Sequence, residues 1–361
     1  MKLNLSVAIA TFALSFVSCS QQDNTPSLKD EWGHKYLIGT AVNQWQVAGE
    51  TPIETAAILK HFNCVTAENC MKSEVINPQK GVWDFTLADE FVAFAEKNNL
   101  TIMGHAPIWH SQQAKWFCFD DNGELVCADT LKQRIHDHIF TVMQRYKGKI
   151  KGYDVVNEAI EDDGSYRNSL MYQIMGEEFI DWSFQCAMEA DPDAELYYND
   201  YSMWAEGKRN TVCELIKRLK SKNIKIDAIG LQCHYGMDFP EVSAFEESIK
   251  AFINEGVRVQ FTEFDMSILP NPYTGADVAT RFQYTPDKDP YRDGVPADVQ
   301  AAWNARVKEF IAIIDKYQDK VNRITFWGVT DSSSWKNDFP IPGRKDYALP
   351  IDREGNLKDI L

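Results

Sequence analysis

The chain contains 361 residues, with a hydrophobic fraction of 44%, an aromatic fraction of 12% and a formal charge of −16 at pH 7. This length accommodates one large α/β domain or two ordinary domains. The acidic balance argues against a nucleic-acid partner, because binding phosphates requires a basic face and the sequence has no basic stripe. The aromatic share suits a surface that stacks on flat, uncharged partners such as sugar rings.

The first twenty residues, MKLNLSVAIATFALSFVSCS, combine one lysine with an apolar run and end in small residues. This layout is typical of an export signal rather than of a membrane span. The run closes on Phe16-Val17-Ser18-Cys19, which resembles a bacterial lipobox. We therefore predict a lipoprotein-type signal peptide over residues 1–19 with lipidation of Cys19, and cleavage without lipidation is the alternative. Residues 20–30 are polar and predict a tether between the membrane and the domain.

Seven cysteines follow Cys19, an odd number without the C-x-x-C spacing of a zinc site. We therefore expect no metal centre. Cys118 and Cys127 flank the turn sequence Asn122-Gly123. A disulfide across this hairpin and a pair of free thiols are both compatible with the spacing.

Short apolar runs alternate with amphipathic stretches from residue 36 onward, which predicts βα units around a parallel sheet. The predicted strands cover residues 36–42, 63–68, 100–105, 152–158, 195–200, 228–234, 257–265 and 322–329. The clearest helical patterns cover residues 87–99, 129–149, 177–190, 209–223 and 299–320. Eight strands predict a closed (β/α)8 TIM barrel of the α/β class. A doubly wound open sheet is the alternative, but no Gly-rich phosphate loop follows the first strand.

No linker divides the series, so we predict a single catalytic domain over residues 31–361. One long excursion, residues 266–296, is rich in Pro, Asp and Tyr and follows the seventh predicted strand. Loops of this length are commonly functional.

The carboxyl ends of all barrel strands open on one face, where the chemistry of such folds is built. Polar or aromatic residues stand at or just beyond seven of the eight predicted ends. They are Glu68, Asn69 and Lys72; His105, Trp109 and His110; Asn157 and Glu158; Asn199 and Asp200; Gln232 and His234; Glu263 and Asp265; Trp327 and Trp335. Each residue alone is more often structural, but together they predict one shared site.

Two of these residues, Glu158 and Glu263, meet the requirement of retaining glycoside hydrolysis for one proton-donating acid and one nucleophilic carboxylate. We expect Glu263 to accept a hydrogen bond from His234, whose other nitrogen Asp265 orients, and this stabilises a charged Glu263. Glu158 follows an apolar run and neutral Asn157, and an ionised Glu263 nearby raises its proton affinity. The residues therefore predict Glu158 as the acid and Glu263 as the nucleophile.

Seven segments resemble, in order and spacing, the motifs of family 10 glycoside hydrolases, the retaining endo-β-1,4-xylanases. They are DVVNEAIEDDGSYRNS, LQCHY, FTEFD, ENCMK, GHAPIWH, LYYNDY and TFWGVTDSSSW. The resemblance implies the same roles for Glu158 and Glu263. It also implies that Asn157 binds the 2-hydroxyl group of the sugar over Glu263, that Gln232, His105 and Trp109 surround this sugar, and that His234 and Asp265 support Glu263. The next sugar on the glycone side would be bound by Glu68, Asn69 and Lys72. Trp327 and Trp335 would form the aromatic floor and wall of the cleft. The family normally continues beyond PIDREGNLKDIL through a closing helix, so we expect the last helix to be short or missing.

These features together predict an exported, monomeric xylanase that acts on xylan or xylo-oligosaccharides without a cofactor or metal. It would contact the membrane only through its lipid anchor, at the cell surface or in the periplasm. One alternative is a related retaining barrel hydrolase of β-glucan or mannan. The other is a non-catalytic, glycan-binding surface lipoprotein.

Overall fold

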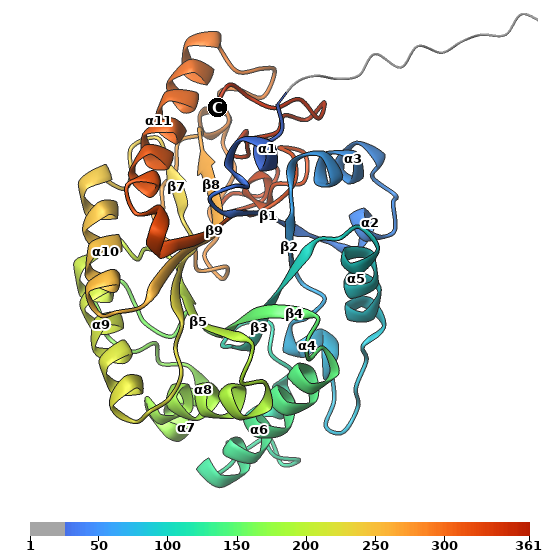
Figure 1. Ribbon diagram of the computed structural model, residues 1–361, viewed down its shortest axis with the longest axis vertical. Coiled ribbons are helices and arrows are strands. Elements are labelled where there is room, and N and C mark those ends of the chain that lie inside the picture. Colours follow the sequence, from blue (N-terminus) through green and yellow to red (C-terminus); the bar gives the residue numbers. More distant parts are fainter. Residues whose placement is uncertain (1–25) are drawn as a thin grey trace, which may run out of the picture.

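The strands close into a parallel barrel in the computed structural model, which describes residues 26–361 (Figure 1). The nine strands are β1 (Leu37–Val42), β2 (Cys64–Ala67), β3 (Thr101–Trp109), β4 (Ile150–Asn157), β5 (Glu195–Asp200), β6 (Ala228–Leu231), β7 (His234–Gly236), β8 (Arg258–Ser267) and β9 (Val321–Phe326). Consecutive strands pair in parallel except β6 and β7, each of which pairs with β8, and β9 pairs with β1 to complete the ring. The predicted (β/α)8 barrel is confirmed.

Within residues 26–361, seven long helices surround this ring (Figure 1). Each of them buries apolar side chains. These helices are α3 (Pro52–His61), α5 (Thr86–Lys97), α6 (Ala128–Arg145), α8 (Glu178–Ala190), α9 (Glu206–Ser221), α10 (Val242–Asn254) and α11 (Ala297–Asp315). In α10, for example, Phe245, Ile249 and Phe252 are fully buried at helical spacing. Burial of such stripes against the outer face of the sheet is the main source of stability in this fold.

The remaining helical segments are short and lie in the connections. They are α1 (Leu28–Trp32), α2 (Gln44–Val47), α4 (Ser73–Ile76), α7 (Leu170–Met175) and the 3-10 turns η1 (Lys115–Phe117), η2 (Pro286–Lys288), η3 (Gln318–Lys320) and η4 (Trp335–Asn337). After β9, the described chain contains η4 and no α-helix as far as Leu361. The expectation of a missing last helix therefore agrees with the structure.

The folded domain begins earlier than predicted. Ser27 caps α1 by accepting a hydrogen bond from the backbone N–H of Asp30 at 3.2 Å, and Leu28 is fully buried. Residues 28–30 therefore belong to a helix and not to the tether assigned to 20–30. Cys19 and the predicted signal peptide lie outside the described residues.

The sixth predicted strand, 228–234, is broken in the structure. Cys233 has a φ of +64°, in the left-handed region that a strand cannot accommodate, and it separates β6 from β7. This break explains nine strands in an eight-membered barrel. Across it, Gln232 and His234 both line the cavity described below.

The hairpin around Gly123 forms as predicted, with Phe119 paired to Leu125. Cys118 is buried, Cys127 is exposed, and both are free thiols, so the disulfide alternative is wrong in this structure.

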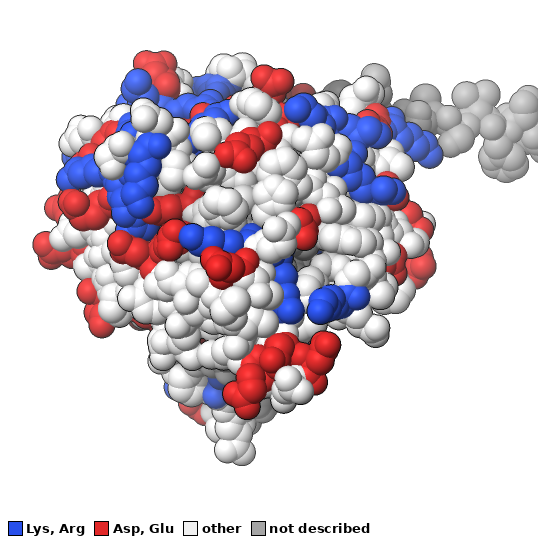
Figure 2. Space-filling view, turned by 90° about the horizontal axis from the view of Figure 1, so that it is seen from below, with Lys and Arg blue, Asp and Glu red and all other residues white. Residues whose placement is uncertain are grey.

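Surface charge is mixed on the face drawn in Figure 2, where acidic and basic side chains are interspersed. Within residues 26–361, every helix falls short of the length or apolarity that a membrane crossing requires.

Candidate active site

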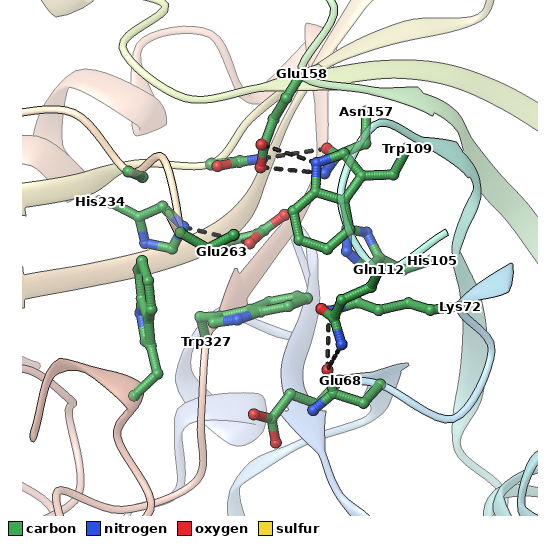
Figure 3. A pocket seen from close by; sticks show the side chains of 15 residues that line it. Glu68, Lys72, His105, Trp109, Gln112, Asn157, Glu158, His234, Glu263 and Trp327 are labelled. Carbon is green, nitrogen blue, oxygen red and sulfur yellow. Dashed lines mark hydrogen bonds and ion pairs between the residues drawn. The ribbon is translucent and has the colours of Figure 1, made fainter. Parts of the chain in front are cut away.

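A cavity of about 130 Å³ opens among the carboxyl ends of the strands and is lined by the predicted residues (Figure 3). Its lining comprises Glu68, Asn69, Lys72, His105, Trp109, Gln112, Asn157, Glu158, Gln232, His234, Glu263, Ala276, Val278, Trp327 and Trp335. Of the predicted strand-end residues that the structure describes, His110, Asn199, Asp200 and Asp265 do not line the cavity. Asp265 lies directly behind His234. Most of the side chains predicted from the ends of the strands therefore lie together in one cavity.

Glu158 stands one residue beyond β4, where the backbone turns out of the barrel. Its φ of +57° ends the strand and directs the side chain into the cavity. The backbone is held on both sides, because its N–H donates to the carbonyl of Asn199 at 2.9 Å and its carbonyl accepts from Nε of Arg167 at 2.9 Å.

Three donors contact the Glu158 carboxyl group. The indole Nε1 of Trp109 lies 2.8 Å from Oε2, and the amides of Gln232 and Asn157 lie 3.0 and 3.1 Å from Oε1. Burial nevertheless raises the pKa of Glu158 to about 7, and the negative charges of Asp200 and Glu263 act in the same direction. A carboxyl group in this state carries its proton in weakly acidic solution and can release it near neutrality.

Glu263 points into the same cavity from β8 and has the opposite character (Figure 3). Burial acts to raise its pKa, but hydrogen bonds from His234 and Asn199 and the charge of His105 outweigh burial and hold the pKa below its usual value. Asn199 Nδ2 lies 2.8 Å from Oε1, and His234 Nε2 lies 3.3 Å from Oε2. Glu263 is therefore ionised under conditions in which Glu158 is protonated.

His234 lies between two carboxylates. Its Nδ1 is 2.9 Å from Oδ2 of Asp265, while Nε2 faces Glu263. Burial acts to lower the pKa of His234, yet the two acidic neighbours raise it overall. An imidazolium satisfies both contacts, because both of its nitrogens donate. Asp265 also accepts a hydrogen bond from the Trp335 indole at 2.6 Å, so Trp335 is connected to Glu263 through Asp265 and His234.

The end of the cavity near β2 is polar and has one cationic side chain. Nζ of Lys72 donates to Asn69 Oδ1 at 2.9 Å and to Gln112 Oε1 at 2.6 Å, and it lies 4.7 Å from the Trp109 ring centroid. Burial lowers the pKa of Lys72 and raises that of Glu68. This end offers several hydrogen-bond donors and acceptors beside an aromatic surface.

Trp327 and His105 form the floor of the cavity. Their rings meet edge to face with centroids 5.1 Å apart, and Nδ1 of His105 lies 3.0 Å from Asp154 Oδ2. Because both residues are buried and held by neighbours, the floor is fixed before a ligand arrives.

The sequence prediction did not include three residues that line this site. Gln112, Ala276 and Val278 come from connections without any periodic pattern, so no sequence signal marked them. Asn199 was among the predicted strand-end residues, near the end of the fifth predicted strand, but its contact with Glu263 was not predicted. Asp200 at the same end is fully buried and accepts from Lys208 Nζ at 2.9 Å, outside the cavity lining.

The two carboxyl groups share one cavity, and their pKa values are shifted in opposite directions. Such a pair at the carboxyl ends of the strands of a (β/α)8 barrel is typical of a glycoside hydrolase. The chain belongs to glycosyl hydrolase family 10, whose model matches residues 27–361.

Similar proteins agree with this family. The chain is 46% identical over 340 residues to endo-1,4-beta-xylanase A of Xylanibacter ruminicola, covering 94% of this chain and 92% of the relative. It is 37% identical to a beta-1,4-xylanase of Dictyoglomus thermophilum, covering 99% and 95%. Among solved structures, a GH10 endoxylanase from a sugarcane soil metagenome superposes with a TM-score of 0.89 at 41% identity, covering 92% of this chain and 98% of that one.

Proposed function

We propose that the protein is a retaining endo-β-1,4-xylanase that hydrolyses xylan or xylo-oligosaccharides by double displacement. The observation that carries this proposal is the opposite protonation of Glu158 and Glu263 within one cavity. The names of the similar proteins supply the substrate, since those proteins are xylanases.

In the first step, Glu263 attacks the anomeric carbon while Glu158 transfers its proton to the glycosidic oxygen. The C–O bond to the leaving sugar breaks, and a covalent glycosyl-enzyme forms on Glu263. In the second step, Glu158 removes a proton from water, and the resulting oxygen nucleophile displaces Glu263 from the same carbon. Two inversions give a product with retained configuration.

The supporting residues divide between the two sugars on the glycone side. Asn157, Gln232, His105 and Trp109 would surround the sugar over Glu263, with Asn157 on its 2-hydroxyl group. Glu68, Asn69 and Lys72 would bind the next sugar, where Lys72 and Glu68 can donate to and accept from its hydroxyls. His234 and Asp265 keep Glu263 charged, which favours attack over protonation.

Selectivity for xylose over glucose would come from Trp335. Its ring contacts three neighbours. It stacks on Phe339 with ring centroids 4.3 Å apart, packs edge to face with His234 at a centroid distance of 4.8 Å, and donates a hydrogen bond to Asp265. Displacing a side chain that is packed in this way to admit the additional hydroxymethyl group of glucose would cost free energy.

The proposal extends to the N-terminal segment. Residues 1–19 would be a lipoprotein-type signal peptide, Cys19 the lipidated residue of an exported, membrane-anchored and monomeric enzyme, and the residues before Ser27 a tether. Metabolic labelling with a fatty acid tests this, because Cys19→Ala should abolish incorporation of the label.

The decisive experiment compares reducing-sugar release from xylan, cellulose and mannan. Preferential release from xylan, with a β-anomeric first product by NMR, is expected. Preference for cellulose or mannan would assign a related hydrolase, and binding without turnover would assign a glycan-capture protein. Trapping with a 2-fluoro-xylobioside should label Glu263, and a label on another carboxylate would contradict the mechanism.

A further inference from the structure

A second hollow, of about 470 Å³, lies beside the active site and is not used by the mechanism above. Four segments form it: the connection after β1, the start of α3, the connection after β9 and the turn near the C-terminus. The lining residues used below are Asn43, Trp45, Ile53, Ser332 and Arg353. Its volume falls in the range typical of ligand sites.

Residues that line the hollow are connected at two points to residues that line the active-site cavity. The backbone N–H of Glu68 donates to Val42 at 2.9 Å, and the side chain of the next residue, Asn43, hydrogen-bonds the Glu68 carboxyl group. At the second point, Ser332 of the hollow precedes Trp335 of the cavity by three residues in the chain. In Figure 3, Glu68 lies at the end of the cavity remote from Glu158. The second hollow therefore adjoins the end of the cavity at which Glu68 lies.

The surface of the hollow combines apolar faces with polar groups. Trp45 and Ile53 are each 53% exposed, the largest exposures among the large apolar side chains of the described residues. Asn43, Ser332 and Arg353 stand around them. A pyranose ring matches this composition, because its C–H faces are apolar and its hydroxyl groups point outward around the rim.

The position of Trp45 is fixed by hydrogen bonds of its neighbours. Asn43 Oδ1 accepts from the backbone N–H of Trp45 at 3.1 Å. Gln46 donates to Glu54 at 2.9 Å, and Thr330 donates to the same carboxylate at 2.8 Å. These bonds join α2, α3 and the connection after β9. The indole is thus presented on an ordered support, which reduces the entropy lost when a ligand stacks on it.

We propose that this hollow is a distal glycone subsite that binds the third xylosyl residue of the substrate, with Trp45 as its stacking platform. The inference rests on the proposed function and deepens it, because it assigns a sugar to a surface beyond Glu68. It makes Trp45 a determinant of chain-length preference and leaves the reacting groups unchanged.

The test compares aryl β-xylobioside with aryl β-xylotrioside, in which the aryl group takes the place of the leaving sugar. Wild-type enzyme should show a kcat/KM about three- to tenfold higher for the trioside. Trp45→Ala should bring the trioside to the level of the bioside while hydrolysing the bioside at the wild-type rate. Trp45→Phe should retain part of the preference. Phe282→Ala, which removes an aromatic ring that is 40% exposed in the loop after β8, serves as the matched control and should keep the wild-type ratio.

The outcomes separate this inference from the proposed function. Hydrolysis of both glycosides with an unchanged trioside-to-bioside ratio in Trp45→Ala would overturn the subsite while leaving the xylanase assignment intact. Equal wild-type rates on both glycosides would have the same meaning. Failure of the wild-type enzyme on either glycoside would overturn the xylanase assignment and the subsite with it.

Discussion

Asn199 joins the two halves of the catalytic centre with one amide group. Its Nδ2 lies 2.8 Å from Oε1 of Glu263 and 2.9 Å from Oδ1 of Asn157, the residue before Glu158. The amide is oriented by Thr262, whose hydroxyl donates to Asn199 Oδ1 at 2.6 Å. Each hydrogen of the Asn199 amide is therefore directed at a different residue of the cavity.

Replacing Asn199 should weaken Glu263 as a nucleophile. Loss of one hydrogen bond to a charged group costs about 1.5–3 kcal/mol, so Asn199→Ala should lower kcat/KM by about 10- to 100-fold. The acid limb of the pH–rate profile should move to higher pH, because the amide no longer favours ionised Glu263. Asn199→Asp should shift this limb further through charge repulsion. An unchanged limb in both variants would show that the amide does not act on Glu263.

The pH dependence of the enzyme should follow Glu158 on its alkaline side. The raised pKa of about 7 means that Glu158 carries its proton below pH 7, and kcat/KM should fall as pH rises through that value. Glu263 has a pKa below its usual value, so activity should be lost only in more acidic solution. Steady-state rates on a xylo-oligosaccharide between pH 3 and pH 10, about seven units, would map both limbs.

The loss of activity on replacing Glu158, the acid, should depend on the leaving group of the substrate. Glu158→Gln should cut kcat/KM on xylan by about 10²- to 10⁴-fold, because the glycosidic oxygen then leaves without a proton. A dinitrophenyl xylobioside needs no protonation, and its first step, measured as the burst of aryl release, should be nearly spared. Equal losses on both substrates would contradict the role of Glu158 as acid.

Trp335 should control discrimination against glucose. Trp335→Ala removes the ring that packs against Phe339 and His234 and opens space at the cavity wall. The ratio of kcat/KM for aryl cellobioside to that for aryl xylobioside should rise, by about tenfold on the scale of one small group in a pocket. Phe339→Leu, which changes the support of Trp335 but not the indole itself, should give a smaller rise. A fall in both rates with a constant ratio would locate selectivity elsewhere.

Arg167 is a positioning residue for Glu158. Its guanidinium reaches the Glu158 carbonyl, the Tyr201 hydroxyl at 2.5 Å and Asp277 at 3.3 Å, and so holds a backbone in the left-handed region. Arg167→Lys cannot reproduce this fork. We expect kcat to fall by about tenfold or more with little change in KM, since a misplaced acid affects the transition state. Arg209→Lys, in an exposed pair with Glu247, is the control. A raised KM at constant kcat would indicate a binding role instead.

The C-terminal segment should contribute strongly to stability through Lys358. Its Nζ lies 2.8 Å from Asp331 Oδ2 and 4.3 Å from the Trp303 ring centroid, and Asp331 is fully buried. Lys358→Ala leaves an uncompensated buried carboxylate, which costs about 3–5 kcal/mol. Calorimetry should show a Tm lower by about 5–10 °C. Lys308→Ala breaks only an exposed pair with Asp359 and should change Tm very little.

Sequence patterns predicted most of the architecture because strand and helix periodicities are local properties. Five of the seven long helices, α5, α6, α8, α9 and α11, coincide with predicted helical patterns, and twelve of the lining residues are strand-end residues predicted from the sequence. The carboxyl ends of all strands in a barrel lie on one face, so Glu158 and Glu263 line the same cavity although they are far apart in the chain.

The misses have physical causes of a different kind. Cys233 follows the apolar run from Ala228 to Leu231 by one residue, and nothing in the composition of this segment marks a left-handed residue. The role of Asn199 depends on Thr262, which belongs to another strand. Gln112 occupies a loop without periodicity. By contrast, the start of α1 was readable, because Ser27 followed by Asp30 is a helix-start signature that the polar composition of the segment concealed.

The break between β6 and β7 couples the two protonation equilibria of the active site. Gln232 and His234 flank Cys233, and one contacts Glu158 while the other contacts Glu263. A substitution that relaxes the backbone at Cys233, such as a β-branched residue that resists a positive φ, displaces both contacts in one movement. Tuning the alkaline boundary of activity alone therefore requires a contact on another strand, such as that of Trp109 with Glu158.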